Sequence, residues 1–260
     1  MMRALRKFVV LPKWGGGKLV LPPYKWWCAP SKSYNRREYG PVDTIVIHAT
    51  AGSSSSGAMS VTNAGTASWH WLVPDENESA HGHYAHRCVA DEKKAWHVLR
   101  TVRFPCAYQG MELRNPGHTD INSRAYGIEI VNAQTGRDPF SDWQLRITAQ
   151  IVNYHRSLHP DIGMYLTTHA YLDPSRKLDP GEQFTWDLFL KYIMEGEQPM
   201  PEVPDMDEWA APAVAAVKDA GIMTGYPDGT FRGREPVSRQ ELASVIARLL
   251  TRMAENAPVA

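Results

Sequence analysis

Two short apolar segments, each ending in a histidine, constrain the fold of this chain more than any other feature. Residues 43–48 read DTIVIH and residues 165–169 read YLTTH. Ile45 and Ile47 recur at every second position, which is the side-chain period of a β-strand. Because each histidine follows directly on an apolar strand, we expect both imidazoles at one edge of a sheet.

Strand-like and helix-like segments are mixed along the central part of the chain. Further strands are expected at residues 69–73 and 127–131, and residues 141–159 carry apolar side chains at helical spacing until Pro160 ends the pattern. A brief helix is expected near residues 185–194. This order predicts an α/β fold with one mixed central sheet flanked by helices.

The chain divides by composition into four parts. Residues 1–40 carry nine basic residues against one acidic residue and hold no lasting period, so we interpret them as a basic N-terminal extension packed on the next domain. Residues 41–194 form the central domain, in which the Gly/Ser run at 52–57 is expected to be a loop. Residues 195–204, with the sequence EGEQPMPEVP, have the composition of a linker.

The part after the linker, residues 205–256, is expected to be a small helical module. Helical patterns occur near residues 209–220 and 239–252. The second pattern begins with Ser238 and Glu241 at the spacing of a capping box, in which each side chain binds the backbone N–H of the other residue. No second copy of this unit occurs in the sequence.

The composition excludes several classes of protein. A hydrophobic share of 43% suits a globular core, and no apolar stretch approaches the roughly 18 residues that would span a bilayer. Pro12 ends the first apolar segment too early for a signal peptide, so we expect synthesis in the cytoplasm without a standard export signal. The odd count of three cysteines favours free thiols, although Cys88 and Cys106 could pair.

The sequence contains ten histidines, so the presence of a histidine is weak evidence for a metal site. The candidate ligands have to be chosen by their position in the sequence. Catalytic zinc takes three protein ligands and keeps a fourth position open for water. His48 and His169 end the two apolar segments, and Asp179 follows in the loop KLDPG, whose Pro-Gly turn can hold its direction. Taken singly, each histidine is more often a surface or capping residue, but together the three form a candidate zinc site.

Five sequence blocks strengthen this interpretation, and they read DTIVIHATAG, ASWHWLVP, AWH, AYGIEIVN and LTTHAYLDPSRKLDPGEQFTW. Over roughly residues 41–190 the chain resembles the zinc N-acetylmuramoyl-L-alanine amidases, which include T7-type phage lysozyme, AmpD-type enzymes and peptidoglycan recognition proteins. The resemblance implies their fold, zinc as cofactor and peptidoglycan as substrate. Its implied site residues are the metal ligands His48, His169 and Asp179, the acidic Glu129 and the basic Lys177.

The implied roles agree with general chemistry. Zinc lowers the pKa of bound water to about 7, which makes hydroxide available near neutral pH. With Ile128 and Ile130 facing the core, Glu129 points to the other face of its strand, where it could take a proton from water and later protonate the leaving amine. Lys177 could stabilise the oxyanion. The alternatives are a solvated strand residue for Glu129 and a surface charge for Lys177.

Three positions depart from the family pattern. Ala49 stands where many relatives have a second histidine, and the block AWH continues into Val-Leu-Arg instead of a small residue and glycine. Trp69 stands where some phage members have a tyrosine near the metal, which places more of the acid–base chemistry on Glu129. Trp69 and His97 are candidate substrate contacts, and a packed structural role is equally open for His97. Four further histidines are interpreted as structural or surface residues: His70, His81, His83 and His86.

The C-terminal module resembles a single S-layer homology motif, with D-x-W-A, GYPDGTF and SRQEL in that order. Such motifs bind cell-wall polymers of Gram-positive bacteria, and the resemblance implies Trp209 and Arg239 as contacts. An arginine near a helix N-terminus suits an anionic polymer. The motifs normally occur in threes, so a single copy predicts weak binding or a homo-oligomer that recreates the trimer. A packing or oligomerisation module is the alternative.

These observations predict hydrolysis of the amide between N-acetylmuramic acid and L-alanine, in the manner of a phage or prophage endolysin that acts at the cell wall. Two alternatives stay open: a non-catalytic peptidoglycan-recognition protein, and a zinc peptidase that cuts within the stem peptide. No HExxH occurs in the sequence, which counts against the commonest zinc peptidases. The basic residues of the extension are scattered among glycine and proline, so no nucleic-acid partner is expected.

Overall fold

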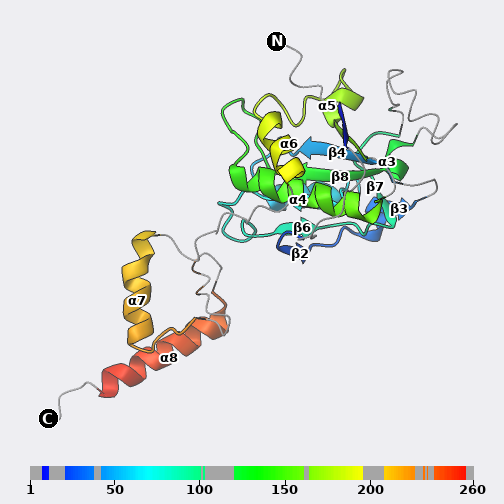
Figure 1. Cartoon of the computed structure of the whole chain (residues 1–260). Coiled ribbons are helices and arrows are strands. Elements are labelled where there is room, and N and C mark those ends of the chain that lie inside the picture. Colours follow the sequence, from blue (N-terminus) through cyan, green and yellow to red (C-terminus); the bar gives the residue numbers. More distant parts are fainter. Residues whose placement is uncertain are drawn as a thin grey trace. The chain divides into compact units, whose positions relative to one another are not determined.

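The computed structural model describes residues 8–11, 21–37, 42–100, 102, 120–160, 164–195, 208–225, 231, 233 and 237–255. The chain divides into two compact units, Met1–Pro201 and Glu202–Ala260 (Figure 1). The domain boundaries inferred from the sequence stay predictions.

Among its described residues, the larger unit has a mixed sheet of seven strands in the order β1-β9-β4-β8-β5-β6-β2. Their bounds are β1 (Phe8–Leu11), β2 (Tyr24–Trp26), β4 (Thr44–Ala49), β5 (Trp71–Val73), β6 (Ala85–Arg87), β8 (Ala125–Ile130) and β9 (Met164–Thr168). The central strands β9, β4, β8 and β5 run parallel, whereas β1 and β6 pair antiparallel with their neighbours β9 and β5. Every residue of β4 and β8 is buried, as in parallel strands covered on both faces. The predicted α/β fold with a mixed sheet is confirmed.

The N-terminal residues contain more regular structure than their sequence predicts. Strand β1 lies at one edge of the sheet and β2, which runs parallel to β6, lies at the other. A 3-10 helix, η1 (Ser31–Ser33), and strand β3 (Tyr34–Arg36) follow, and β3 pairs with β7 (Lys93–Ala95) in a second small sheet. Each of these strands has three or four residues, which is too short for an alternating pattern to stand out.

Helices cover both faces of the sheet, and the labelled helices in front of the strands in Figure 1 belong to one of these faces. Their bounds in this unit are α1 (Ser55–Asn63), α3 (Ile121–Arg124), α4 (Asp142–Leu158), α5 (His169–Leu172) and α6 (Trp186–Glu195). Trp71 of β5 donates from Nε1 to His155 Nε2 of α4 at 2.9 Å, whereas the next residue, Leu72, packs in a cluster with Met59 of α1. Because successive side chains of a strand point to opposite faces, α4 and α1 lie on opposite sides of the sheet.

The predicted helices after residue 140 occur where expected. Helix α4 begins after Ser141, which forms a capping box with Gln144, and it ends at Leu158 before Pro160. Helix α6 falls within one residue of the expected segment. Both patterns are local, so the sequence was sufficient to place them.

The expectation of a loop over residues 52–57 is wrong in its second half. Helix α1 begins there at Ser55, and the Ser54 side chain accepts a hydrogen bond from Gly57 N. The carboxylate of Glu78 accepts from Ser55 N at 2.9 Å and so binds another free backbone donor of the first turn. This second acceptor is distant in the sequence, so the Gly/Ser run looks like a loop when it is taken alone.

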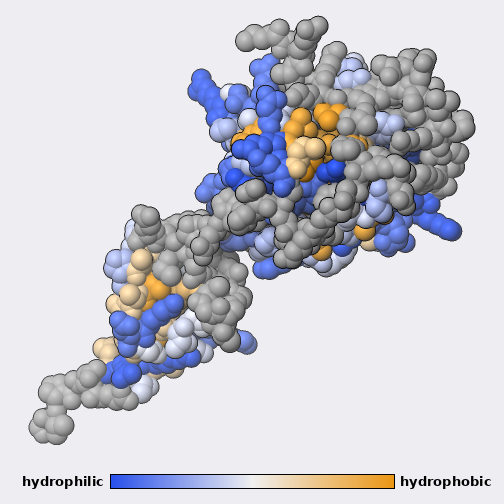
Figure 2. Space-filling model, in the orientation of Figure 1, coloured by the Kyte–Doolittle hydropathy of each residue, from blue (hydrophilic) through white to orange (hydrophobic). Residues whose placement is uncertain are grey.

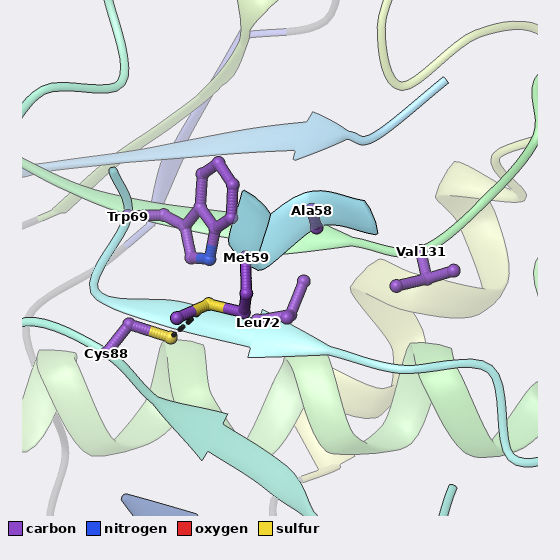
Figure 3. Packing of buried hydrophobic residues seen from close by; sticks show 6 residues of the cluster. All are labelled: Ala58, Met59, Trp69, Leu72, Cys88 and Val131. Carbon is purple, nitrogen blue, oxygen red and sulfur yellow. Dashed lines mark hydrogen bonds between the residues drawn. The ribbon is translucent and has the colours of Figure 1, made fainter. Parts of the chain in front are cut away.

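A small apolar cluster packs between α1 and the sheet (Figure 3). Its buried members are Ala58, Met59, Trp69, Leu72, Cys88 and Val131. Cys88 is a free thiol whose Sγ lies 3.8 Å from Met59 Sδ, and burial raises the pKa of this thiol. Cys28 is also free and is exposed, whereas Cys106 lies outside the described residues.

The smaller unit contains η3 (Glu208–Ala210), α7 (Ala211–Asp219) and α8 (Arg239–Glu255). The predicted capping box is present, because Ser238 N donates to Glu241 Oε2 at 2.8 Å and Glu241 N donates to Ser238 Oγ at 3.2 Å. On the face of this unit that Figure 2 shows, apolar and hydrophilic side chains lie next to one another. None of the described helices has the length and apolar character needed to cross a membrane.

Candidate metal centre

Three predicted zinc ligands converge in the larger unit. His48 lies in β4, His169 is the first residue of α5, and Asp179 lies in the loop between α5 and α6. His48 Nδ1 is 3.0 Å from His169 Nδ1 and 3.4 Å from Asp179 Oδ2, and His169 Nδ1 is 3.1 Å from the same oxygen. All three side chains are buried. Within the described part of the chain, no other three potential metal ligands meet in this way.

The spacing of these three atoms fits a zinc ion. Donors at about 2.0–2.1 Å from a tetrahedral metal lie about 3.3 Å from one another. The observed separations of 3.0, 3.1 and 3.4 Å bracket that value. Two imidazole nitrogens and one carboxylate oxygen also form the kind of donor set that catalytic zinc sites use. The residues therefore suit the metal that the sequence predicted.

The parallel sheet and a short helix hold these groups in place. In the register of β4 and β8, His48 lies opposite Glu129, so both side chains belong to the same face. His169 begins α5, where the side chain of Thr168 accepts from Tyr171 N as the N-cap. The prediction had placed His169 at the end of the strand, and the difference is one residue. Asp179 is tied to the same helix because Ala170 N donates to the carbonyl of Asp179 at 3.0 Å.

Burial and hydrogen bonds favour the protonation states in which His48 and Asp179 can bind a metal. Burial lowers the pKa of His48 to about 4, and its hydrogen bond with Asp179 opposes that effect only in part. Burial alone would raise the pKa of Asp179, but hydrogen bonds from His169 and His48 outweigh it and hold that pKa below its usual range. Neutral imidazole and ionised carboxylate are the forms that bind a metal, so little protonation energy opposes binding near neutral pH.

Glu129 and Lys177 line the same pocket as the three ligands, with a volume of about 420 Å³. Glu129 is 9% exposed, and burial together with the charge of Asp179 raises its pKa to about 8, an effect that Lys177 opposes. A carboxyl group whose pKa lies near neutrality can both accept and return a proton. The backbone N–H of Lys177 donates to Asp173 O at 2.9 Å, which anchors its loop to α5.

The remaining predicted site residues fall into two places. Trp69 and His97 line the pocket, although each is largely buried. Trp209 and Arg239 belong to the smaller unit, where Trp209 is 82% exposed and Arg239 is the exposed first residue of α8.

The pocket also contains residues that the sequence did not indicate. Ala51 and Gln134 line it from the loops after β4 and β8, and both have positive φ angles, of 50° and 54°. The two loops are joined, because Thr50 Oγ1 accepts from Gly52 N and from Asn132 N, each at 3.2 Å. A left-handed backbone at an alanine or a glutamine leaves no mark in a sequence, so these residues could not be found from it.

Comparison with known protein families shows to which of them this chain is related. Residues 38–182, more than half of the chain, match the family model of N-acetylmuramoyl-L-alanine amidase. The chain belongs to this amidase family. Residues 203–243 of this amidase-family chain match the S-layer homology domain. Both relationships that the sequence motifs predicted are therefore confirmed.

Curated relatives match separate parts of this amidase-family chain. The 1,6-anhydro-N-acetylmuramyl-L-alanine amidase AmpD of Escherichia coli is 31% identical over 101 residues, which are 39% of this chain and 48% of that protein. The outer membrane protein SlpA of Deinococcus radiodurans is 42% identical over 61 residues, which are 22% of this chain and 5% of SlpA. The chain thus spans under half the length of either relative.

Solved structures to which this chain is similar include an AmpD derivative and AmpDh3 from Pseudomonas aeruginosa. The first is 21% identical with a TM-score of 0.49, covering 68% of this amidase-family chain and 98% of the AmpD chain. The second is 21% identical with a TM-score of 0.48, covering 84% of this chain and 86% of AmpDh3.

Proposed function

We propose that this protein hydrolyses the amide bond between the lactyl group of N-acetylmuramic acid and the L-alanine of peptidoglycan stem peptides, with zinc held by His48, His169 and Asp179. The observation that carries the proposal is the triangle of two Nδ1 atoms and one carboxylate oxygen, with sides of 3.0 to 3.4 Å. It lies in a pocket that also contains Glu129 and Lys177.

The side chains of the pocket have complementary tasks in this reaction. Zinc, when bound, supplies Lewis acidity and lowers the pKa of water. Glu129 takes a proton from the attacking water and delivers it to the amine of L-alanine as that amine leaves. The ammonium group of Lys177 binds the oxygen on which negative charge develops. Trp69 forms part of the wall against which the substrate lies.

The relatives support this substrate class. AmpD proteins from three bacteria, 30–31% identical over 101 residues, are described as amidases of 1,6-anhydro-N-acetylmuramyl-L-alanine. A muramyl amide is therefore the first compound to test as a substrate.

For the smaller unit we propose binding to an anionic cell-wall polymer through Trp209 and Arg239. Trp209 is 82% exposed, an unusual setting for a large aromatic side chain that contributes nothing to a core. Arg239 is the exposed first residue of α8, and its positive charge at the positive end of the helix dipole favours an anion. Such attachment would bring the catalytic pocket to the wall, in keeping with an endolysin, and several copies would strengthen it.

Mass spectrometry of digested peptidoglycan tests the catalytic proposal. The digests should compare the wild-type protein, the zinc-stripped protein, Glu129→Gln and, as a matched control, Glu182→Gln on an exposed loop. We expect stem peptides that begin with L-alanine from the wild type and from Glu182→Gln. Removal of zinc should abolish them, and Glu129→Gln should slow their release by roughly 10²- to 10⁴-fold.

Other products would select a different function. Fragments cut within the stem peptide would make the protein a zinc peptidase. Binding to the wall without any fragments would make it a recognition protein.

A further inference from the structure

His97 lies beside the candidate metal centre and contacts one of its proposed ligands. It follows strand β7, and its Nδ1 is 3.0 Å from the Nε2 of His48. The two rings meet edge to face, with centroids 5.1 Å apart and planes at 82°. The opposite nitrogen of His48, Nδ1, is the atom that faces His169 and Asp179.

A metal bound at Nδ1 would determine where the proton of His48 resides. A nitrogen that binds a metal must offer its lone pair, so neutral His48 must carry its proton on Nε2 if Nδ1 is the ligand. His97 Nδ1 then accepts that proton in a hydrogen bond. We propose that His97 is a positioning residue, which fixes the tautomer and the ring orientation of His48 for metal binding. The inference rests on the proposed zinc centre.

The surrounding structure holds the His97 ring in this position. Gly127 of β8 packs against it, and a Cβ at Gly127 would lie 2.5 Å from Cγ and 2.9 Å from Nδ1 of His97. Any side chain at position 127 would therefore displace the ring. Glycine weakens the interior of a strand, and close approach of another group is a common reason for its presence. The contact with His97 explains this glycine.

The backbone on both sides of His97 is also anchored. Trp96 N donates to Ser68 Oγ at 2.8 Å, and Val98 N donates to the side chain of Asn122 at 3.0 Å. The amide of Asn122 donates in return to Val98 O at 2.7 Å. These bonds fix the backbone from which the His97 ring extends to His48.

The burial of His97 favours this role over contact with substrate. The residue is 6% exposed, and its Nε2 is buried without a hydrogen-bond partner. The polar contact that orients the ring is therefore the one to His48. Groups that hydrogen-bond a metal-binding histidine from behind contribute roughly 10- to 100-fold to metal affinity.

Zinc affinity, measured on the full-length protein by competition with a chromogenic chelator, tests the inference. His97→Leu fills the space but removes the acceptor, so we expect zinc affinity to fall by roughly 10- to 100-fold. His97→Asn is the matched variant, because its Oδ1 replaces Nδ1 as acceptor, and it should restore most of that affinity. The melting temperature of each zinc-free protein shows whether the fold is intact.

Three results would overturn the inference while the wild type still binds zinc. Unchanged affinity in His97→Leu would exclude the positioning role. Equal losses in His97→Leu and His97→Asn would show that the ring only fills space. Unchanged affinity with a raised KM for a soluble muramyl peptide would make His97 a substrate contact. Failure of the wild type to bind zinc would instead refute the proposed function.

A spectroscopic readout avoids variants that fail to fold. Nitrogen-15 NMR of the histidine rings in the zinc-loaded wild type should show His48 protonated on Nε2 and His97 with an unprotonated, accepting Nδ1. A proton on Nδ1 of His97 would contradict the inference, because that nitrogen could not then accept from His48.

Discussion

At the scale of single residues, burial decides the charge state of several histidines. His155 is fully buried, its ring stacks on Tyr126 with centroids 3.7 Å apart, and its Nε2 accepts from Trp71 Nε1. Burial holds its pKa well below 6.5, and the positive charges of nearby arginines act in the same direction. The neutral ring is stabilised by these contacts, and protonation would place an unpaired charge in the core.

This burial predicts a loss of stability in acid. Below pH 6.5 the unfolded chain takes up a proton at position 155 that the folded chain does not, so the free energy of unfolding falls as pH falls. One such histidine contributes about 1.4 kcal/mol per pH unit in that range. His155→Gln keeps an acceptor for Trp71 but cannot be protonated, so its stability should fall less steeply between pH 6 and pH 5.

Urea unfolding of the zinc-free proteins at pH 8, 7, 6 and 5 provides the measurement. Above pH 7 the wild type and His155→Gln should show the same pH dependence, which serves as the internal control. Equal slopes below pH 6 would mean that His155 is protonated in the folded state.

At the scale of elements, neighbouring parallel strands bring the chemistry together. The register of β4 against β8 sets His48 opposite Glu129, and that of β4 against β9 sets Ile47 opposite Thr168, just before His169. Strand ends that meet at one edge of a parallel sheet are common positions for sites. The pocket of this protein follows from that register together with the loop that carries Asp179.

The contact between Gly127 of β8 and the ring of His97, which follows β7, leads to a prediction. Gly127→Ala should destabilise the protein by about 1–3 kcal/mol, because the new Cβ overlaps the His97 ring. In the His97→Ala background that overlap disappears, so the same substitution should cost much less. A double-mutant cycle by urea unfolding measures this coupling. An equal cost in both backgrounds would show that glycine is needed for the strand itself.

At the scale of the whole molecule, the residues of the two proposed tasks, catalysis and wall binding, lie in different compact units. The larger unit contains every described residue of the candidate metal centre, and the smaller unit contains Trp209 and Arg239. Attachment of an enzyme to an insoluble substrate raises its local concentration there without any new contact in the pocket. The two tasks should therefore be separable by substitution in the intact chain.

Trp209→Ala and Arg239→Gln in the full-length protein should weaken co-sedimentation with purified cell walls several-fold. Hydrolysis of a soluble muramyl peptide should stay at the wild-type rate. Arg239→Lys is the matched control, since it keeps the charge, and added salt should reduce binding of the wild type because exposed charges are screened. Unchanged sedimentation of both variants would leave the smaller unit with a packing or oligomerisation role.

The sequence by itself determined what depends on local patterns. The alternation of Ile45 and Ile47, the helical spacing before Pro160 and the capping box of Ser238 and Glu241 each act over a few residues, and the structure has the corresponding elements. The family motifs also identified the three residues that meet as a candidate metal site. Patterns of this kind are readable because the residues that interact are close in the chain.

Only the tertiary structure decided the features that depend on distant contacts. It placed β1 and β2 at opposite edges of the sheet, and it supplied the first turn of α1 with the carboxylate of Glu78. It also brought His97 onto His48, 49 positions away along the chain, and set its ring against Gly127. A sequence records propensity and spacing, whereas these contacts arise when separate segments fill the same space at native packing density. For that reason the candidate metal ligands could be named in advance, whereas the contact between His97 and His48 could not.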